Sequence, residues 1–250
     1  MELLISILLA TGLAAAPAAP PSQESGDVVA STDRMPPREL DGRLRLSANF
    51  PNELHRLYGA ERAARGEWDD ALRQFTEAAR HADKYSQHRI SLMYWHGAGE
   101  LKRDPALAYA WADLAAERMY PGFLVLREKM WLELTDAERE RALREGAVLY
   151  ERYGDKVAKP RLAAAIARQN SQVTGSRTGY VDGRLSAYSA GPGATSIDDN
   201  STGTDLRPMY EAWRLDPERY WAVEDAIWKD GSVDIGKAVK TDGEAAPAEK

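Results

Sequence analysis

The chain has 250 residues, of which 44% are hydrophobic and 29% are charged, a composition that can support a globular core. Its formal net charge of -6 provides no broad basic field, so general binding to the backbone of DNA or RNA is not expected. The absence of cysteine excludes disulfides, thiolate zinc sites, iron–sulfur clusters, a cysteine nucleophile and an acylated lipoprotein cysteine.

The first 19 residues have the features of a secretory signal peptide. The apolar stretch 3–13 has the length of a signal-peptide core and is too short to span a bilayer. Small residues follow it, and cleavage near Ala18 or Ala19 fits them best. Because Glu2 is the only charge before this stretch, an uncleaved anchor or a misassigned start is the alternative. We expect a periplasmic or secreted protein with no stable membrane span after cleavage.

Residues 20–48 have the composition of a linker. They are rich in Pro, Ser, Asp and Gly and show no sustained apolar period. We expect this segment to separate the folded part of the chain from the N-terminus.

Residues 49–170 are predicted to form a helical repeat domain. Within 66–79, apolar side chains fall at i, i+3, i+4, i+7, i+10 and i+11 counted from Trp68, which places them on one helix face. The pattern recurs 37 positions later, where Ala108 takes the place of Ala71. Small residues at these positions let two helix backbones approach closely. Recurrence at this period predicts an all-α fold, an α/α solenoid of about two to three helix pairs with flexible N- and C-terminal extensions.

The most specific pattern is a helix that ends in a Gly-rich turn, followed by a helix that Asp104 and Pro105 open. The residues concerned are Ile90, Leu92, Tyr94, Gly97, Gly99, Asp104, Ala108, Trp111, Ala115 and Ala116. At these positions the chain resembles the Sel-like repeat, a member of the tetratricopeptide-like superfamily, although Ser91 replaces the usual Gly. The resemblance implies a right-handed superhelix whose concave groove binds other proteins, and it implies no active site.

A third pair of helices is predicted next. Pro121 can open one helix, and Thr135 with Glu138 forms the capping box of a second, long helix that Gly154 is expected to stop. Pro160 is predicted to open a last helix.

Beyond this domain the composition becomes polar again. Residues 171–206 are predicted to be a flexible linker, in which the compact TGSRTG at 174–179 is either a plain polar stretch or a specific turn. Residues 207–230 contain three tryptophans and a helix start at Asp216 and Pro217. This Trp-rich helix is expected to dock back onto the repeat domain, or alternatively to bind a partner as a helix in a groove. The tail, 231–250, is predicted to be disordered.

No pattern in the sequence supports catalysis or a metal site. The four histidines match no metal-ligand motif, and no nucleophile elbow or phosphate-binding loop is present. Adjacent acids such as Asp69 and Asp70 are better interpreted as charge at a helix N-terminus. We therefore expect no enzyme activity, no cofactor and no metal.

The sequence favours an exported, non-catalytic scaffold that binds a protein or peptide partner through a helical-repeat groove, and not nucleic acid. The residues predicted to bind the partner are Tyr94, Trp95, Tyr109, Trp213, Trp221 and Trp228. Packing in the repeat core is the alternative for Tyr94. Two other functions stay open: a self-associating or self-capped structural module, and a cell-envelope enzyme with an unrecognised active site.

Overall fold

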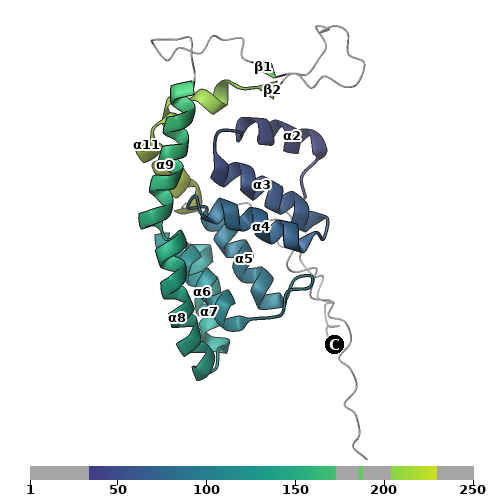
Figure 1. Ribbon diagram of the computed structural model, residues 1–250, viewed down its shortest axis with the longest axis vertical. Coiled ribbons are helices and arrows are strands. Elements are labelled where there is room, and N and C mark those ends of the chain that lie inside the picture. The colour runs from purple at the N-terminus through teal and green to yellow at the C-terminus, as the bar shows by residue number, and fades with distance from the viewer. Residues whose placement is uncertain (1–33, 173–185, 188–203, 230–250) are drawn as a thin grey trace, which may run out of the picture.

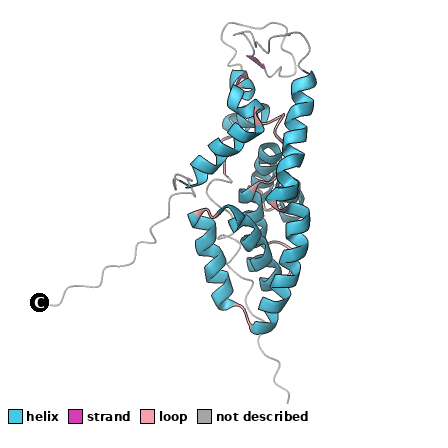
Figure 2. Ribbon diagram, turned by 90° about the vertical axis from the view of Figure 1, so that its left-hand side faces the viewer, coloured by secondary structure: helices cyan, strands magenta, loops and turns pink. Residues whose placement is uncertain are grey.

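The computed structural model describes residues 34–172, 186–187 and 204–229 (Figure 1). The predicted signal peptide, the TGSRTG stretch and the tail at 231–250 lie outside these ranges. Within them the predicted all-α class is confirmed, and Figure 2 shows that helices form nearly all of the fold. None of the described helices combines the length and the hydropathy that a membrane crossing requires.

The helices follow one another through short connections. In chain order the first eight are α2 (Pro37–Leu46), α3 (Pro51–Ala64), α4 (Trp68–Ala79), α5 (Lys84–His96), α6 (Pro105–Ala115), α7 (Pro121–Glu133), α8 (Asp136–Tyr153) and α9 (Asp155–Gln172). A 3-10 turn, η2 (Ala116–Arg118), joins α6 to α7. The C-terminal elements are η3 (Arg207–Tyr210), α10 (Ala212–Leu215) and α11 (Pro217–Lys229).

A two-residue strand pair lies in the segment that the sequence predicted to be a flexible linker. Strand β1 (Ser186–Ala187) runs antiparallel to β2 (Thr204–Asp205), with Ser186 opposite Asp205. The pair lies at one end of the molecule, beside the start of the C-terminal elements (Figure 1).

Two closely packed helix pairs form the centre of the fold, because α3 packs mainly on α4 and α5 on α6. The equivalent alanines Ala71 and Ala108 are both fully buried, as their small size predicted. Gly59 on α3 lets the buried ring of Phe75 on α4 lie against the helix backbone. A Cβ atom at Gly59 would stand only 2.6 Å from that ring.

The third predicted pair is arranged differently from the first two. Both α7 and α8 pack on α6. The predicted capping box at the start of α8 is confirmed: Thr135 N–H donates to Glu138 Oε2 at 2.9 Å, and Glu138 N–H donates to Thr135 Oγ1 at 3.3 Å. The helical class is therefore established, whereas a regular solenoid stays a prediction.

The predicted linker at 20–48 is wrong for residues 37–46, which form α2. Ion pairs one turn apart, Glu39 with Arg43 and Asp41 with Arg45, each at 2.8 Å, support this exposed helix. Its leucines are too sparse to give a clear apolar period, and none of its residues is fully buried. Leu46, at its end, packs on the cluster around Phe50.

The helix predicted to open at Pro160 begins instead at Asp155, so Pro160 lies inside α9. The backbone N–H of Asp155 donates to the Glu117 carboxylate, at 3.2 and 3.0 Å from its two oxygens. Glu117 lies 38 positions earlier in the chain, on η2. Because this helix start is stabilised by a distant side chain, the local sequence around Asp155 gave no sign of it.

Candidate binding surface

The C-terminal elements η3, α10 and α11 pack onto the helical body, and we call residues 206–229 the cap. Tyr220, near the start of α11, contacts α3, whereas Trp228, near its end, contacts α5 and α7. We call the surface beneath the cap the α3–α5–α7 face. Both α10 and α11 also touch α9, beside which α11 lies in Figure 1. The predicted helix at Pro217–Lys229 is confirmed, and it is docked on the body.

Tyr220 anchors the cap at α3. Its side chain is completely buried, and its ring stacks on Phe50 with a centroid distance of 5.7 Å. The hydroxyl accepts a hydrogen bond from Asn52 Nδ2 at 2.6 Å and donates one to Glu53 Oε1 at 2.8 Å. Burial, followed by the nearby Glu53 and Glu224 carboxylates, raises the pKa of Tyr220 well above its usual value. The phenol therefore stays neutral and serves as a positioned hydrogen-bond donor.

Glu53 collects donors from both sides of this contact. Besides Tyr220, its carboxylate accepts from Ser47 Oγ at 3.1 Å and from Arg214 Nη2 at 2.7 Å. The Arg214 and Glu53 side chains are only 12% and 11% exposed, so water screens this ion pair little. The Arg214 guanidinium also lies over the Phe50 ring at 4.1 Å. Since Arg214 belongs to the cap and Glu53 to the body, the pair joins the two parts.

Trp228 anchors the other end of α11 in a group of aromatic rings. Its ring centroid lies 5.9 Å from Tyr85, 5.2 Å from Phe123 and 6.1 Å from Tyr120. The Tyr120 hydroxyl donates to Asp225 Oδ1 at 2.5 Å. Burial is the main cause that raises the pKa of Tyr120, and the Asp225 carboxylate adds to it.

Trp221 faces basic groups of the body. The Arg118 guanidinium lies 4.4 Å and the Lys159 ammonium 5.0 Å from its ring centre, which is cation–π geometry. Arg118 is held by a 2.6 Å ion pair with Asp155. The buried Lys84 ammonium lies 3.1 Å from the same carboxylate. This network fixes the cations against which the Trp221 ring rests.

The structure separates the predicted partner-binding residues into two groups. Trp213, Trp221 and Trp228 lie half-buried between cap and body. The others lie on α5 and α6, where Trp95 and Tyr109 pack with Trp131 and Tyr94 packs on the central core. All six are partly buried, and the two groups occupy different parts of the molecule.

Sequence reasoning missed the polar residues of the body that hold the cap. Asn52 and Glu53 follow Pro51 and resemble ordinary residues of a first helical turn. Arg56 pairs with Asp83 at 3.0 Å, and burial, which would lower its pKa, is outweighed by neighbouring carboxylates that raise it. Their partners lie more than 160 positions away in the cap, so no local pattern identifies them.

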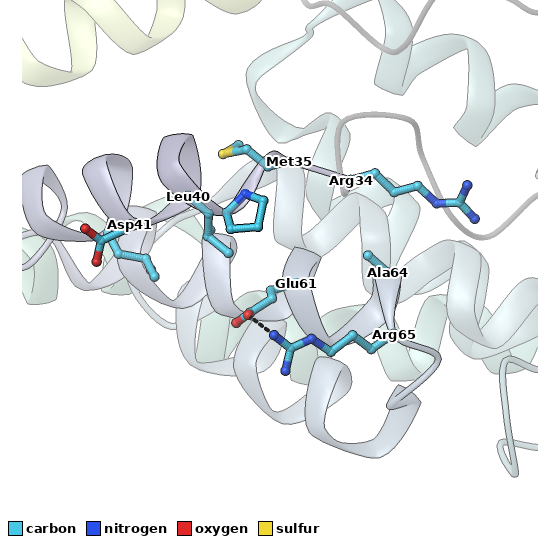
Figure 3. A pocket seen from close by; sticks show the side chains of 9 residues that line it. Arg34, Met35, Leu40, Asp41, Glu61, Ala64 and Arg65 are labelled. Carbon is cyan, nitrogen blue, oxygen red and sulfur yellow. Dashed lines mark hydrogen bonds and ion pairs between the residues drawn. The ribbon is translucent and has the colours of Figure 1, made fainter. Parts of the chain in front are cut away.

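Two hollows adjoin these elements. One, of about 460 Å³, lies between α2 and α3 and has a mixed apolar and charged lining that includes the Glu61–Arg65 ion pair (Figure 3). The other, of about 290 Å³, lies between α11 and the body, where Leu57 and Ile227 are among its lining residues. It borders Glu53 and Trp228, so the cap leaves part of its seat unfilled.

The histidines have structural surroundings. His55 Nδ1 lies 2.7 Å from Gln74 Oε1, and His81 Nδ1 lies 3.0 Å from the Glu77 carbonyl oxygen. Burial, with a smaller contribution from Arg89, lowers the pKa of His88 to about 3. Among the described residues, no group of three or more His, Cys, Asp or Glu side chains is placed to hold a metal ion.

Comparisons with known proteins returned no match to a family model, to a curated protein or to a solved structure. The resemblance to the Sel-like repeat therefore rests on the residues of the chain alone and stays a prediction.

Proposed function

We propose that the protein is an exported, non-catalytic scaffold that binds a protein or peptide partner through the α3–α5–α7 face. In this proposal the cap occupies the face until the partner displaces it. The function combines a binding scaffold with a self-capped module. One observation carries it: an amphipathic helix, α11, already lies across three helices of the body in the manner of a bound peptide helix.

The composition of the contact supports reversible docking. The cap is held by oriented polar pairs, among them Tyr220 with Glu53, Arg214 with Glu53 and Tyr120 with Asp225. Such pairs exchange for hydrogen bonds to water when the cap leaves, so each contributes only about 1 kcal/mol net. A mixed polar and aromatic contact is typical of interfaces that open and close.

The fit of the cap is also incomplete. Asn52 Oδ1 and Arg214 Nε are buried at this contact and have no hydrogen-bond partner among the described residues. Each such atom costs on the order of 1–3 kcal/mol relative to a paired one. Together with the hollow beside Ile227, these atoms leave room for a partner that satisfies the face better than the cap does.

A cross-link tests the proposal, because the chain has no native cysteine that would compete. Leu57→Cys and Ile227→Cys place one thiol on α3 and one on α11 around the same hollow, where a short bis-maleimide can join them. Tagged chains are used to recover partners from an envelope extract. We expect Trp228→Ala to recover more partner than the natural chain and the cross-linked chain to recover none.

The same cysteine variant without cross-linker and the exposed substitution Lys229→Ala are the controls, and both should behave as the natural chain. Equal recovery of the same partner by the cross-linked and the uncross-linked chain would refute displacement of the cap.

A further inference from the structure

The chemistry of the α3–α5–α7 face specifies what can bind there, and this inference rests on the proposed function. When the cap leaves, the face presents polar groups that are buried in the capped form. Asn52 and Glu53 are 1% and 8% exposed, and the Tyr120 residue is 1% exposed. A replacement helix must offer them partners, since an unpaired buried polar group costs more than a hydrogen bond returns.

The cap satisfies these groups from positions one helical turn apart. Tyr220, Glu224 and Trp228 lie at i, i+4 and i+8 of α11 and therefore share one face of the helix. Tyr220 supplies a phenol to Asn52 and Glu53.

The acidic turn of α11 comes next. The Glu224 carboxylate interacts with the Arg56 guanidinium on α3, and the adjacent Asp225 accepts from the Tyr120 hydroxyl. Arg56 is already paired with Asp83, so the helix adds a second carboxylate to a cation that carries one. A basic residue at these positions would bring a like charge towards Arg56 and would offer Tyr120 no acceptor.

The last requirement is a large ring. Trp228 lies among Tyr85, Tyr120 and Phe123, with ring centroids between 5.2 and 6.1 Å away. A small or a branched aliphatic side chain would leave these rings in contact with water on one side.

We infer that the α3–α5–α7 face selects a partner helix that carries a phenol, acidic residues four and five positions later, and a large aromatic ring eight positions later. The partner is thus an acidic, aromatic amphipathic helix that imitates α11. A helix with a purely aliphatic face would leave Glu53, Asn52 and Tyr120 unpaired, so the face discriminates against the commonest type of amphipathic helix.

The test uses a fluorescent peptide with the sequence of residues 206–229 and the full chain, either natural or carrying Trp228→Ala. The cap in the natural chain competes at an effective concentration of about 1 mM, typical of a short flexible tether. We expect the peptide to bind the Trp228→Ala chain at least about tenfold more tightly than the natural chain, because that chain's own cap is weakened. Fluorescence anisotropy measures both affinities, and circular dichroism checks that the body keeps its helices. Arg214→Ala provides a second weakened cap.

Peptide variants then test selectivity on the Trp228→Ala chain. Tyr220→Phe removes the hydroxyl, Glu224→Lys with Asp225→Lys reverses the charge, and Trp228→Ala removes the ring. Each should bind at least about tenfold more weakly than the natural peptide, whereas the exposed Ala222→Ser should bind equally.

Equal binding of all the peptides would overturn the inferred selectivity and leave displacement of the cap intact. Absence of peptide binding to either weakened chain would overturn the inference. If the cross-linked chain also recovered its partner unchanged, the proposed function would fail with it.

Discussion

Glu53→Gln should release the cap from the body while the body stays folded. The substitution keeps the shape of the side chain but removes the charge that accepts from Arg214, at 2.7 Å, and from Tyr220, at 2.8 Å. A hydrogen bond to a charged group contributes about 1.5–3 kcal/mol, and the amide retains one acceptor oxygen. We therefore expect the free energy of cap docking to fall by about 2 kcal/mol, a factor of about 30 in the opening equilibrium.

Hydrogen exchange measured by mass spectrometry reports this opening segment by segment. Amides of α11 should exchange about 30-fold faster in Glu53→Gln than in the natural chain, in the regime where exchange follows the opening equilibrium. Amides of α4, which lies in the central core, should keep their rates.

Glu61→Gln is the matched control, since it makes the same change on the same helix. Glu61 pairs with Arg65, whose side chain is 54% exposed, and an exposed pair one turn apart contributes only about 0.3–0.5 kcal/mol. Equal acceleration of α11 and α4 in Glu53→Gln would show that cap and body open as one unit, which would refute the reasoning. Unchanged α11 rates would show that Glu53 does not hold the cap.

Three further predictions concern the body. Phe75→Ala should lower the free energy of unfolding by about 3–5 kcal/mol in urea titrations, because the ring is fully buried against Gly59. Asp104→Ala should cost about 1–2 kcal/mol in the same assay, since it removes the N-cap bond to the Leu107 N–H at 3.1 Å and the ion pair with Arg141. The His88 pKa is lowered from 6.5 to about 3, so the unfolded chain binds more protons between these values and stability falls as the pH drops below 6.5. The loss is at most about 1.4 kcal/mol per pH unit, and His88→Phe should remove this slope in urea titrations at pH 7 and pH 5.

Local patterns in the sequence predicted local structure well. Thr135 and Glu138 lie within one turn, and Asp104 with Pro105 starts a helix by itself, so these helix starts follow from neighbouring residues. The small residue at position 71 likewise predicted burial, because a tight helix contact needs one. What these features share is that every interacting group lies within a few residues or one repeat.

The start of α9 and the seat of the cap could not be predicted in this way. Asp155 is capped by Glu117, and Tyr220 is bonded to Asn52, 168 positions away. The tryptophans at 213, 221 and 228 indicated that the C-terminal helix would be buried, since large rings leave water. They did not indicate which face would cover them. That choice is made by Asn52, Glu53 and Tyr120, which are polar and so give no apolar signal in the sequence.

The same polarity makes the cap the part of the fold best suited to open. The central core around Phe75, Ile90 and Met93 is apolar, and exposing it returns nothing in hydrogen bonds with water. The cap contact is different, since its phenol, guanidinium and carboxylates regain hydration on release. The free energy lost on opening is then mainly that of the rings of Tyr220 and Trp228. A partner that supplies two such rings at the same spacing can replace the cap without disturbing the core, which is why the spacing of the rings, and not the number of polar contacts, should set its affinity.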